Sequence, residues 1–179
     1  MSRLTEAGLR QIRSLGPGDE QALARFFQEV AQDPLTSRFF HPHPLTPKYA
    51  AEICRGAGRR RDAYFALWEN KCIVGYSMLR GWDEGYEVPS FGVCVKPSHR
   101  GQGLGQLLLA HAIEESRSRG AAAMRLTVYR DNASAIHIYR KAGFRFRHKN
   151  LQELIGELDL VPVPRAFSPS ASGACSVPD

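Results

Sequence analysis

Segments of alternating or continuous apolar residues predict about seven strands along this chain. They lie at about 9–15, 64–68, 73–79, up to Val95, and at about 124–128, 144–148 and 153–160. Asn70 and Lys71 separate the second and third of these segments, which indicates a hairpin. Pro89 and Gly92 lie near the start of and within the fourth, so we expect a bulge or a late start there.

Four helices are predicted from apolar residues that recur every three or four positions. One lies between Asp19 and Asp33, one opens at Thr46-Pro47, and two more cover about 104–119 and 132–142. The helix over 104–119 is expected to bury Leu107, Leu108 and Ile113. Residues 35–45, which contain two prolines, are expected to form a loop. The order of these elements indicates a mixed α/β domain.

The loop between the strand that ends at Val95 and the following helix holds three glycines within five residues, Gly101, Gly103 and Gly105. Glycine lacks the Cβ atom that would keep an anion away from the backbone, so successive N–H groups can converge on oxygens at a helix start. We therefore expect this loop to bind a pyrophosphate.

Two classes of phosphate loop are excluded by spacing. The loop of nucleotide hydrolases needs a lysine and a serine or threonine after its last glycine, whereas Gln106 and Leu107 follow Gly105. The dinucleotide fingerprint needs a third glycine where Gln106 stands.

The remaining pattern, Arg100-x-x-Gly103-x-Gly105, resembles the acetyl-coenzyme A signature of the GCN5-related N-acetyltransferase (GNAT) superfamily. The segment 128–144, VYRDNASAIHIYRKAGF, is similar to that family's second conserved block. The resemblance implies a single GNAT-like α/β (α+β) domain over residues 1–160, with a twisted, mostly antiparallel sheet. Its fourth and fifth strands are expected to run parallel and to splay apart for acetyl-CoA. Residues 161–179 bury little and are expected to form a disordered tail.

The resemblance also implies where acetyl-CoA, the acyl-donor cosubstrate, would bind. Its pyrophosphate is expected on the main-chain amides of the glycine loop, and its pantetheine arm along the exposed edge of the strand that ends at Val95. A main-chain N–H near Val93 is expected to stabilise the carbonyl oxygen, a contribution of about 3 kcal/mol per donor. The predicted cofactor-binding residues are Val93, Cys94, Val95, Arg100, Gly101, Gln102, Gly103, Leu104, Gly105, Gln106 and Asn132. The alternatives are a merely solvated charge for Arg100 and a helix cap for Asn132.

Acetyl transfer to an amine needs a neutral amine and a proton for the departing thiolate. Tyr139 is the candidate general acid, because a phenol with a pKa of about 10 stays protonated at neutral pH. Glu87 is the candidate base, with a chain of waters as the alternative. A core aromatic role for Tyr139 and a surface charge for Glu87 are the simpler interpretations. His41 and His43 are expected to be solvated in their loop, with acceptor contact as the alternative.

The composition of the chain is typical of one globular domain and gives no sign of a membrane span or of nucleic-acid binding. A length of 179 residues with 43% apolar and 23% charged residues fits one globular domain. No apolar run approaches the roughly 18 residues of a membrane span, and the start lacks the apolar core of a secretory signal, so we expect a cytoplasmic protein without membrane contact. The net charge of +6 is dispersed except at Arg59-Arg60-Arg61, and a polyanionic cofactor accounts for it without nucleic acid.

The four cysteines lie far apart and lack the pairing of metal ligands, so we expect no disulfide and no metal site. Cys54, Cys72 and Cys94 have apolar neighbours that suit buried thiols, and Cys175 lies near the end of the chain.

Together these features predict an acetyl-CoA-dependent N-acetyltransferase that acts on a primary amine by direct attack in a ternary complex. The acceptor is expected to be a small molecule such as an amino sugar, because the segment 39–44 would wall off a compact pocket. A protein N-terminus or lysine is the alternative acceptor, and a noncatalytic acyl-CoA-binding module is the alternative of another class. The chain is expected to be a monomer or a homodimer.

Overall fold

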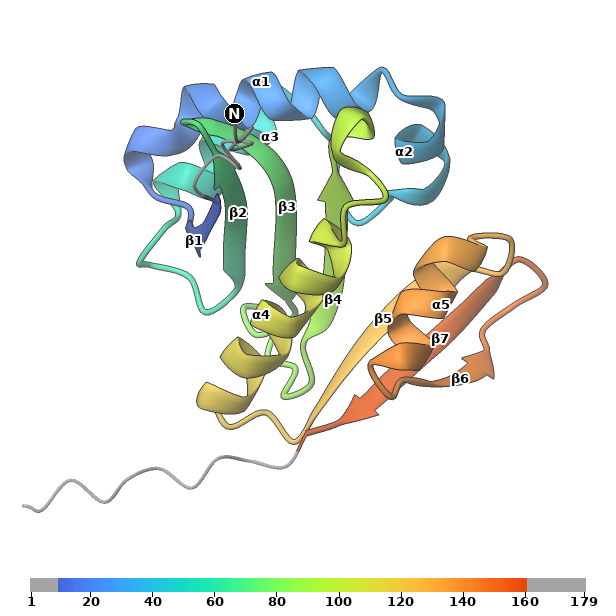
Figure 1. Ribbon diagram of the computed structural model, residues 1–179. Coiled ribbons are helices and arrows are strands. Elements are labelled where there is room, and N and C mark those ends of the chain that lie inside the picture. Colours follow the sequence, from blue (N-terminus) through green and yellow to red (C-terminus); the bar gives the residue numbers. More distant parts are fainter. Residues whose placement is uncertain (1–9, 161–179) are drawn as a thin grey trace, which may run out of the picture.

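A single sheet with the strand order β1-β2-β3-β4-β5-β7-β6 organises the computed structural model, which describes residues 10–160 (Figure 1). Its strands are β1 (Arg10–Ser14), β2 (Ala63–Glu69), β3 (Cys72–Arg80), β4 (Ser90–Val95), β5 (Ala123–Tyr129), β6 (Arg145–His148) and β7 (Glu153–Asp159). The α-helices within this range are α1 (Glu20–Ala31), α2 (Pro34–Phe39), α3 (Pro47–Arg55), α4 (Leu104–Ser118) and α5 (Ala133–Lys141). Two short 3₁₀ turns, η1 (Pro17–Asp19) and η2 (Pro97–His99), complete the order.

The sheet opens between β4 and β5, the parallel pair within the described range. These strands pair only at Ser90 and Arg125, next to a bond from the Arg125 N–H to the Pro89 carbonyl at 3.0 Å. Beyond this point they diverge, and β5, β7, β6 and α5 form a wing set apart from the rest (Figure 1). The seven-stranded sheet and its splayed parallel pair confirm the predicted fold class.

Helices cover both faces of the sheet, because successive strand residues point to opposite sides. Tyr76 and Met78 of β3 pack in a core with Phe26 and Phe27 of α1. Leu79, their neighbour in β3, belongs to a second core that includes residues of α4 and α5. The helices α4 and α5 therefore lie on the same side of the opened sheet, where each borders the gap.

Of two predicted local features of the strands, the hairpin at Asn70 and Lys71 is present, whereas the bulge at Gly92 is not. Asn70 and Lys71 have φ values of 48° and 66°, the left-handed pair that a tight hairpin requires, so the expected hairpin is present. The strand β4 begins late, directly after Pro89, as one of the two alternatives predicted. Gly92 pairs in regular register with Met78, however, so no bulge forms there. A Cβ atom on Gly92 would lie 2.6 Å from the Met78 Cε and 3.3 Å from the Pro42 Cγ, so a larger residue would require these side chains to shift.

The helix α2 lies where a loop was expected, so the described residues contain five α-helices rather than four. Its cap is regular: the Asp33 Oδ2 accepts the Thr36 N–H at 2.7 Å, and Pro34 occupies the first turn. The same combination of cap and proline correctly predicts the start of α3, where the Thr46 hydroxyl accepts the Tyr49 N–H at 3.2 Å.

Burial differs from expectation at two positions. Leu107 is 45% exposed on α4, and Leu108 and Leu109 fill the core in its place. Cys72 is exposed at the start of β3, whereas Cys54 is buried as expected. The prediction was therefore wrong for Leu107 and Cys72.

Three of the predicted features concern residues that the structure does not describe. Leu9 at the start of the first predicted strand, the tail 161–179 and Cys175 lie outside the described residues. Within residues 10–160, no helix is long and apolar enough to cross a membrane.

Candidate active site

The gap between β4 and β5 contains a cavity of about 480 Å³. Residues of α2 and the loop after it form one wall, β4 forms the base, and the turn after β5 with α5 forms the other wall. A second cavity of about 410 Å³ extends from it over the glycine loop at the start of α4. The two cavities share Val93, Val95, Arg100, Asn132, Ser134 and Ala135, so they form one continuous cleft.

The glycine loop presents unpaired main-chain donors to this cleft. Gly101 and Gly103 have φ values of 74° and 76°, and a Cβ atom at either would meet no atom within 4 Å. Among the residues that the structure describes, no acceptor takes the N–H groups of residues 101–106. Such donors at the first turn of a helix form a seat for an anion. The loop therefore offers free donors at the expected position, and pyrophosphate binding there stays a prediction.

Arg100 was expected either to bind the cofactor or to be a solvated charge, and its contacts in the structure were not predicted. Its guanidinium donates to both Asp33 oxygens, at 2.5 and 3.2 Å, and to the Thr36 hydroxyl at 2.9 Å. The hydrogen bond from Arg100 lowers the pKa of Asp33 to about 2. Because Asp33 caps α2, this bidentate pair ties the glycine loop to the helix that walls the cavity.

The edge of β4 that faces the gap is open. Beyond Ser90, no strand within the described range pairs with this edge, so its main-chain polar groups face the cleft. Val93, Cys94 and Val95 all line the cavity. Val93 and Val95 also pack toward α4, while Cys94 packs on the opposite side of the sheet. Burial raises the pKa of the Cys94 thiol to about 12, so this group is not a thiolate at neutral pH.

Other predicted contact residues have structural roles of their own. The Asn132 Oδ1 accepts the Ala135 N–H at 3.2 Å, so Asn132 caps α5, and it also lines both cavities. Gln106 lines the cavity over the loop. The side-chain Oε1 of Gln102 accepts from the Arg10 guanidinium at 2.6 Å, which directs this side chain toward β1. Leu104 is buried at the start of α4.

Tyr139 of α5 lines the cavity of about 480 Å³. Its side chain is 8% exposed, and its ring contacts Phe91 and Phe144 at centroid distances of 6.3 and 5.7 Å. Burial raises the pKa of Tyr139 well above its usual value, so the phenol is protonated at neutral pH.

Glu87 does not line the cleft. It is exposed in the loop between β3 and β4, so the structure does not bring it to Tyr139. The carboxylate that does line the cavity is Asp131, in the turn between β5 and α5. Its position next to Asn132 in the second block was visible in the sequence, but no pattern indicated which way it faces.

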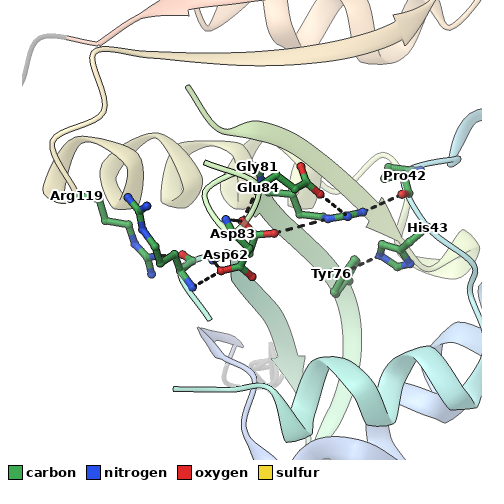
Figure 2. Close-up of polar contacts among 10 residues, drawn as sticks. Pro42, His43, Asp62, Tyr76, Gly81, Asp83, Glu84 and Arg119 are labelled. Carbon is green, nitrogen blue, oxygen red and sulfur yellow. Dashed lines mark hydrogen bonds and ion pairs between the residues drawn. The ribbon is translucent and has the colours of Figure 1, made fainter. Parts of the chain in front are cut away.

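His43 is buried, which corrects the expectation of a solvated residue. Its Nδ1 lies 3.0 Å from the Pro44 carbonyl, which must accept, so Nδ1 carries the proton. Its Nε2 therefore accepts from the Tyr76 hydroxyl at 2.9 Å (Figure 2). The ring stacks on Tyr49 at 4.3 Å, and burial lowers the pKa of His43 to about 4. His41 is exposed, as expected.

A second contact fixes the same loop to β3. Arg80, the last residue of β3, donates to the Pro42 carbonyl at 3.0 Å, and its Nε lies 3.8 Å from the buried Asp62 carboxylate. Figure 2 shows Pro42 and His43 at the ends of these neighbouring contacts. The loop that walls the cavity is thus held at two adjacent positions.

Contacts also cross the mouth of the cleft. Arg38 of α2 forms an ion pair with Asp131. Phe39 and His41 approach the Tyr129 ring at 5.9 and 5.6 Å. These contacts join α2 and its following loop to the wing that carries α5, so the wall of the cavity reaches across the gap.

A sheet split between two parallel strands, with free main-chain amides at one end of the gap, is the arrangement that the resemblance to the GNAT superfamily implied. Residues 24–144 match the model of the Acetyltransferase (GNAT) family, and the chain belongs to this family. It is a GNAT N-acetyltransferase, and acetyl-CoA is its acyl donor.

Two relatives are similar in sequence. Streptothricin acetyltransferase of Streptomyces lavendulae is 50% identical over 162 residues, which cover 79% of this chain and 85% of that protein. Mycothiol acetyltransferase of Rhodococcus opacus (strain B4) is 33% identical over 144 residues, covering 71% of this chain. The match covers 47% of that second protein, so the chain spans about half of its length.

Solved structures share the fold. A Salmonella typhimurium structure with its cofactor acetyl-CoA has a TM-score of 0.68 at 20% identity, and the match covers 91% of this chain and 99% of that chain. The PaiA N-acetyltransferase of Thermoplasma acidophilum, in complex with coenzyme A, has a TM-score of 0.69 at 18% identity, covering 84% and 99%. At these identities the comparisons show the fold alone.

Proposed function

We propose that this acetyltransferase moves the acetyl group of acetyl-CoA to the primary amine of a small molecule, by direct attack in a ternary complex. The observation that carries the proposal is the cavity of about 480 Å³ between β4 and β5. Its mouth is crossed by the contacts of Phe39 and His41 with the Tyr129 ring. Such a walled cavity suits a compact acceptor, whereas a peptide needs an open groove.

The names of the two relatives support the same class of acceptor. Streptothricin and mycothiol are small molecules, and the streptothricin enzyme matches over most of both chains. The match to the [Ribosomal protein bS18]-alanine N-acetyltransferase of Escherichia coli (strain K12) is 43% identical but extends over only 58 residues, 32% of this chain. Protein acetylation therefore remains the second candidate.

The cofactor would bind through the main chain. The free N–H groups of residues 101–106 would hold the pyrophosphate, and the open edge of β4 would pair with the amides of the pantetheine arm. An N–H at this edge, near Val93, would stabilise the negative charge that develops on the carbonyl oxygen. Asn132 borders both parts of the cleft and is placed to contact the arm while it caps α5.

The side chains that line the cavity support direct transfer. The amine nitrogen attacks the thioester carbonyl carbon, the carbon–sulfur bond breaks, and the thiolate takes a proton. Tyr139, whose phenol burial keeps protonated, would donate that proton to the thiolate, and the phenolate would take a proton back from water in the cleft. Cys94 does not compete as a nucleophile, since the pKa of its thiol is raised to about 12.

Deprotonation of the amine is assigned to a chain of waters. Glu87, the other candidate base, is exposed and outside the cavity lining. Water in the cleft would accept the amine proton and pass it to solvent. A substitution of Glu87 by glutamine is accordingly expected to leave the turnover rate close to that of the native enzyme.

Release of the CoA thiol tests the proposal over a panel of acceptors. The panel contains small amines, amino sugars, peptides with free N-termini and peptides with lysine. We expect amine-dependent thiol release with small molecules and formation of the N-acetyl product in equal amount. Turnover of peptides alone would favour the protein acetyltransferase, and acetyl-CoA binding without turnover of any amine would favour the noncatalytic module.

A further inference from the structure

Asp131 is the acidic residue among those that line the cavity of about 480 Å³, within the described part of the chain. Its only ion pair in the described residues is with Arg38. The chain has a net charge of +6, so a cationic acceptor is repelled at long range and needs a local negative group. Asp131 supplies such a group at the mouth of the site.

The ion pair with Arg38 is easily exchanged. The two side chains are 62% and 50% exposed, and exposed pairs of this kind contribute little free energy. A second cation that enters the cavity therefore competes with Arg38 at small cost. Asp33, the neighbouring acid, is different because Arg100 holds both of its oxygens and its side chain is only 14% exposed.

The surroundings of the pair also suit a cation. The Arg38 guanidinium lies 5.2 Å from the centre of the Phe39 ring, within the range of a cation–π interaction. The Phe39 ring in turn lies 5.9 Å from the Tyr129 ring. Arg38 thus occupies a place beside a carboxylate and an aromatic ring, the combination that recognises organic ammonium groups.

We propose that Asp131 binds a positively charged group of the acceptor, which displaces Arg38. This inference rests on the proposed function. The amine that attacks the thioester must be neutral, whereas a carboxylate binds the charged form. The acceptor therefore carries a second cationic group, an ammonium or guanidinium, besides the amine that is acetylated. The substrate class is a small molecule with at least two basic groups.

Paired substitutions separate this role from a purely structural one. Asp131→Asn removes the negative charge, and Arg38→Gln removes the competing cation. With diamines as acceptors, we expect Asp131→Asn to raise the KM about tenfold or more, as expected for a lost hydrogen bond between charged groups. Arg38→Gln is expected to lower the KM or leave it unchanged. A pair that only held α2 against the wing would make both variants raise the KM alike, which would overturn the proposal.

Matched controls complete the experiment. Each diamine is compared with the amino alcohol of the same chain length, which lacks the second charge, and Asp131→Asn is expected to leave its KM unchanged. Asp159→Asn breaks another exposed pair, with Arg145 at 2.6 Å and side chains 72% and 69% exposed, away from the cleft. This control is expected to behave as the native enzyme with every acceptor.

The outcomes distinguish the two proposals. If no small amine is turned over by the native enzyme, the proposed function fails. If diamines and amino alcohols are turned over with equal KM, and Asp131→Asn changes neither, the small-molecule function stands and the role of Asp131 is refuted.

Discussion

Replacement of Gly103 by alanine tests the anion seat at the start of α4. Gly103 is the N-cap of α4 with a φ of 76°, and it lines the cavity over the loop. A Cβ atom there meets no protein atom within 4 Å, so the new methyl group extends into the open cleft. The substitution therefore places a carbon atom where the phosphate would approach the amides.

Two effects of different size are expected. A left-handed φ costs an alanine about 1–2 kcal/mol of stability, and this cost acts on the fold alone. Loss of one charge-assisted hydrogen bond from an amide to the phosphate costs a further ~1.5–3 kcal/mol of binding free energy. The dissociation constant for CoA is thus expected to rise roughly ten- to hundredfold.

Gly120 provides a matched control. Its φ is 78°, a Cβ atom there also meets no atom within 4 Å, and it lies after the other end of α4. Gly120→Ala is expected to lose the same stability in urea unfolding and to bind CoA as the native enzyme does. Isothermal titration calorimetry at fixed salt gives the affinities. Equal CoA affinity in the Gly103 and Gly120 variants would refute the seat.

Three further predictions concern single side chains. Tyr139→Phe is expected to lower kcat about a hundredfold or more, measured as the rate of CoA thiol release, and to leave the CoA affinity unchanged. An unchanged kcat would exclude Tyr139 as the proton donor. The pKa of His43 falls from its usual 6.5 to about 4 on folding, so below pH 6.5 the unfolded chain binds a proton that the native state does not. Between pH 7 and 5 the native protein should therefore lose about 2 kcal/mol more stability than His43→Gln in urea unfolding, and parallel losses would contradict this. Asp33→Asn keeps the cap of α2 but removes the ion pair with Arg100, so at pH 7 we expect a loss of about 1 kcal/mol in the free energy of unfolding. Since the pKa of Asp33 is lowered to about 2, this difference should vanish as the pH falls from about 4 to about 2, and a difference independent of pH would argue against the pair.

The sequence predicted the parts of the site that depend on local chain geometry. Gly101 and Gly103 adopt the left-handed conformations that only glycine adopts at little cost, and the amides that they expose follow directly. Asn132 and Tyr139 lie on one face of α5 because they are seven positions apart. Local spacing was sufficient for these features.

Features that depend on distant segments were not predictable in the same way. His43 is polar and follows a proline, yet it is buried because Tyr49 of α3 and Tyr76 of β3 pack against its ring. The position of Asp131 at the cleft depends on how β5 diverges from β4, and that of Glu87 outside it depends on the path of the loop between β3 and β4. No spacing in the sequence encodes either.

The helix α2 was missed for another reason. It has six residues, too few for a periodic apolar pattern to appear. Its start was nevertheless marked by Asp33-Pro34, a cap followed by a proline, which was interpreted only as the end of α1. Because α2 was not predicted, the sequence did not predict the ion pair between Asp33 and Arg100. The contacts of Arg38 across the cleft were not predicted for the same reason.

A titration of the protein with CoA, followed by the NMR signals of its main-chain amides, tests the central claim most directly. We predict that the largest shifts fall on residues 101–106, with further shifts along Val93–Val95 at the open edge of β4. Unchanged amides in the glycine loop at saturating CoA, or shifts confined to another face of the sheet, would contradict the account of the site.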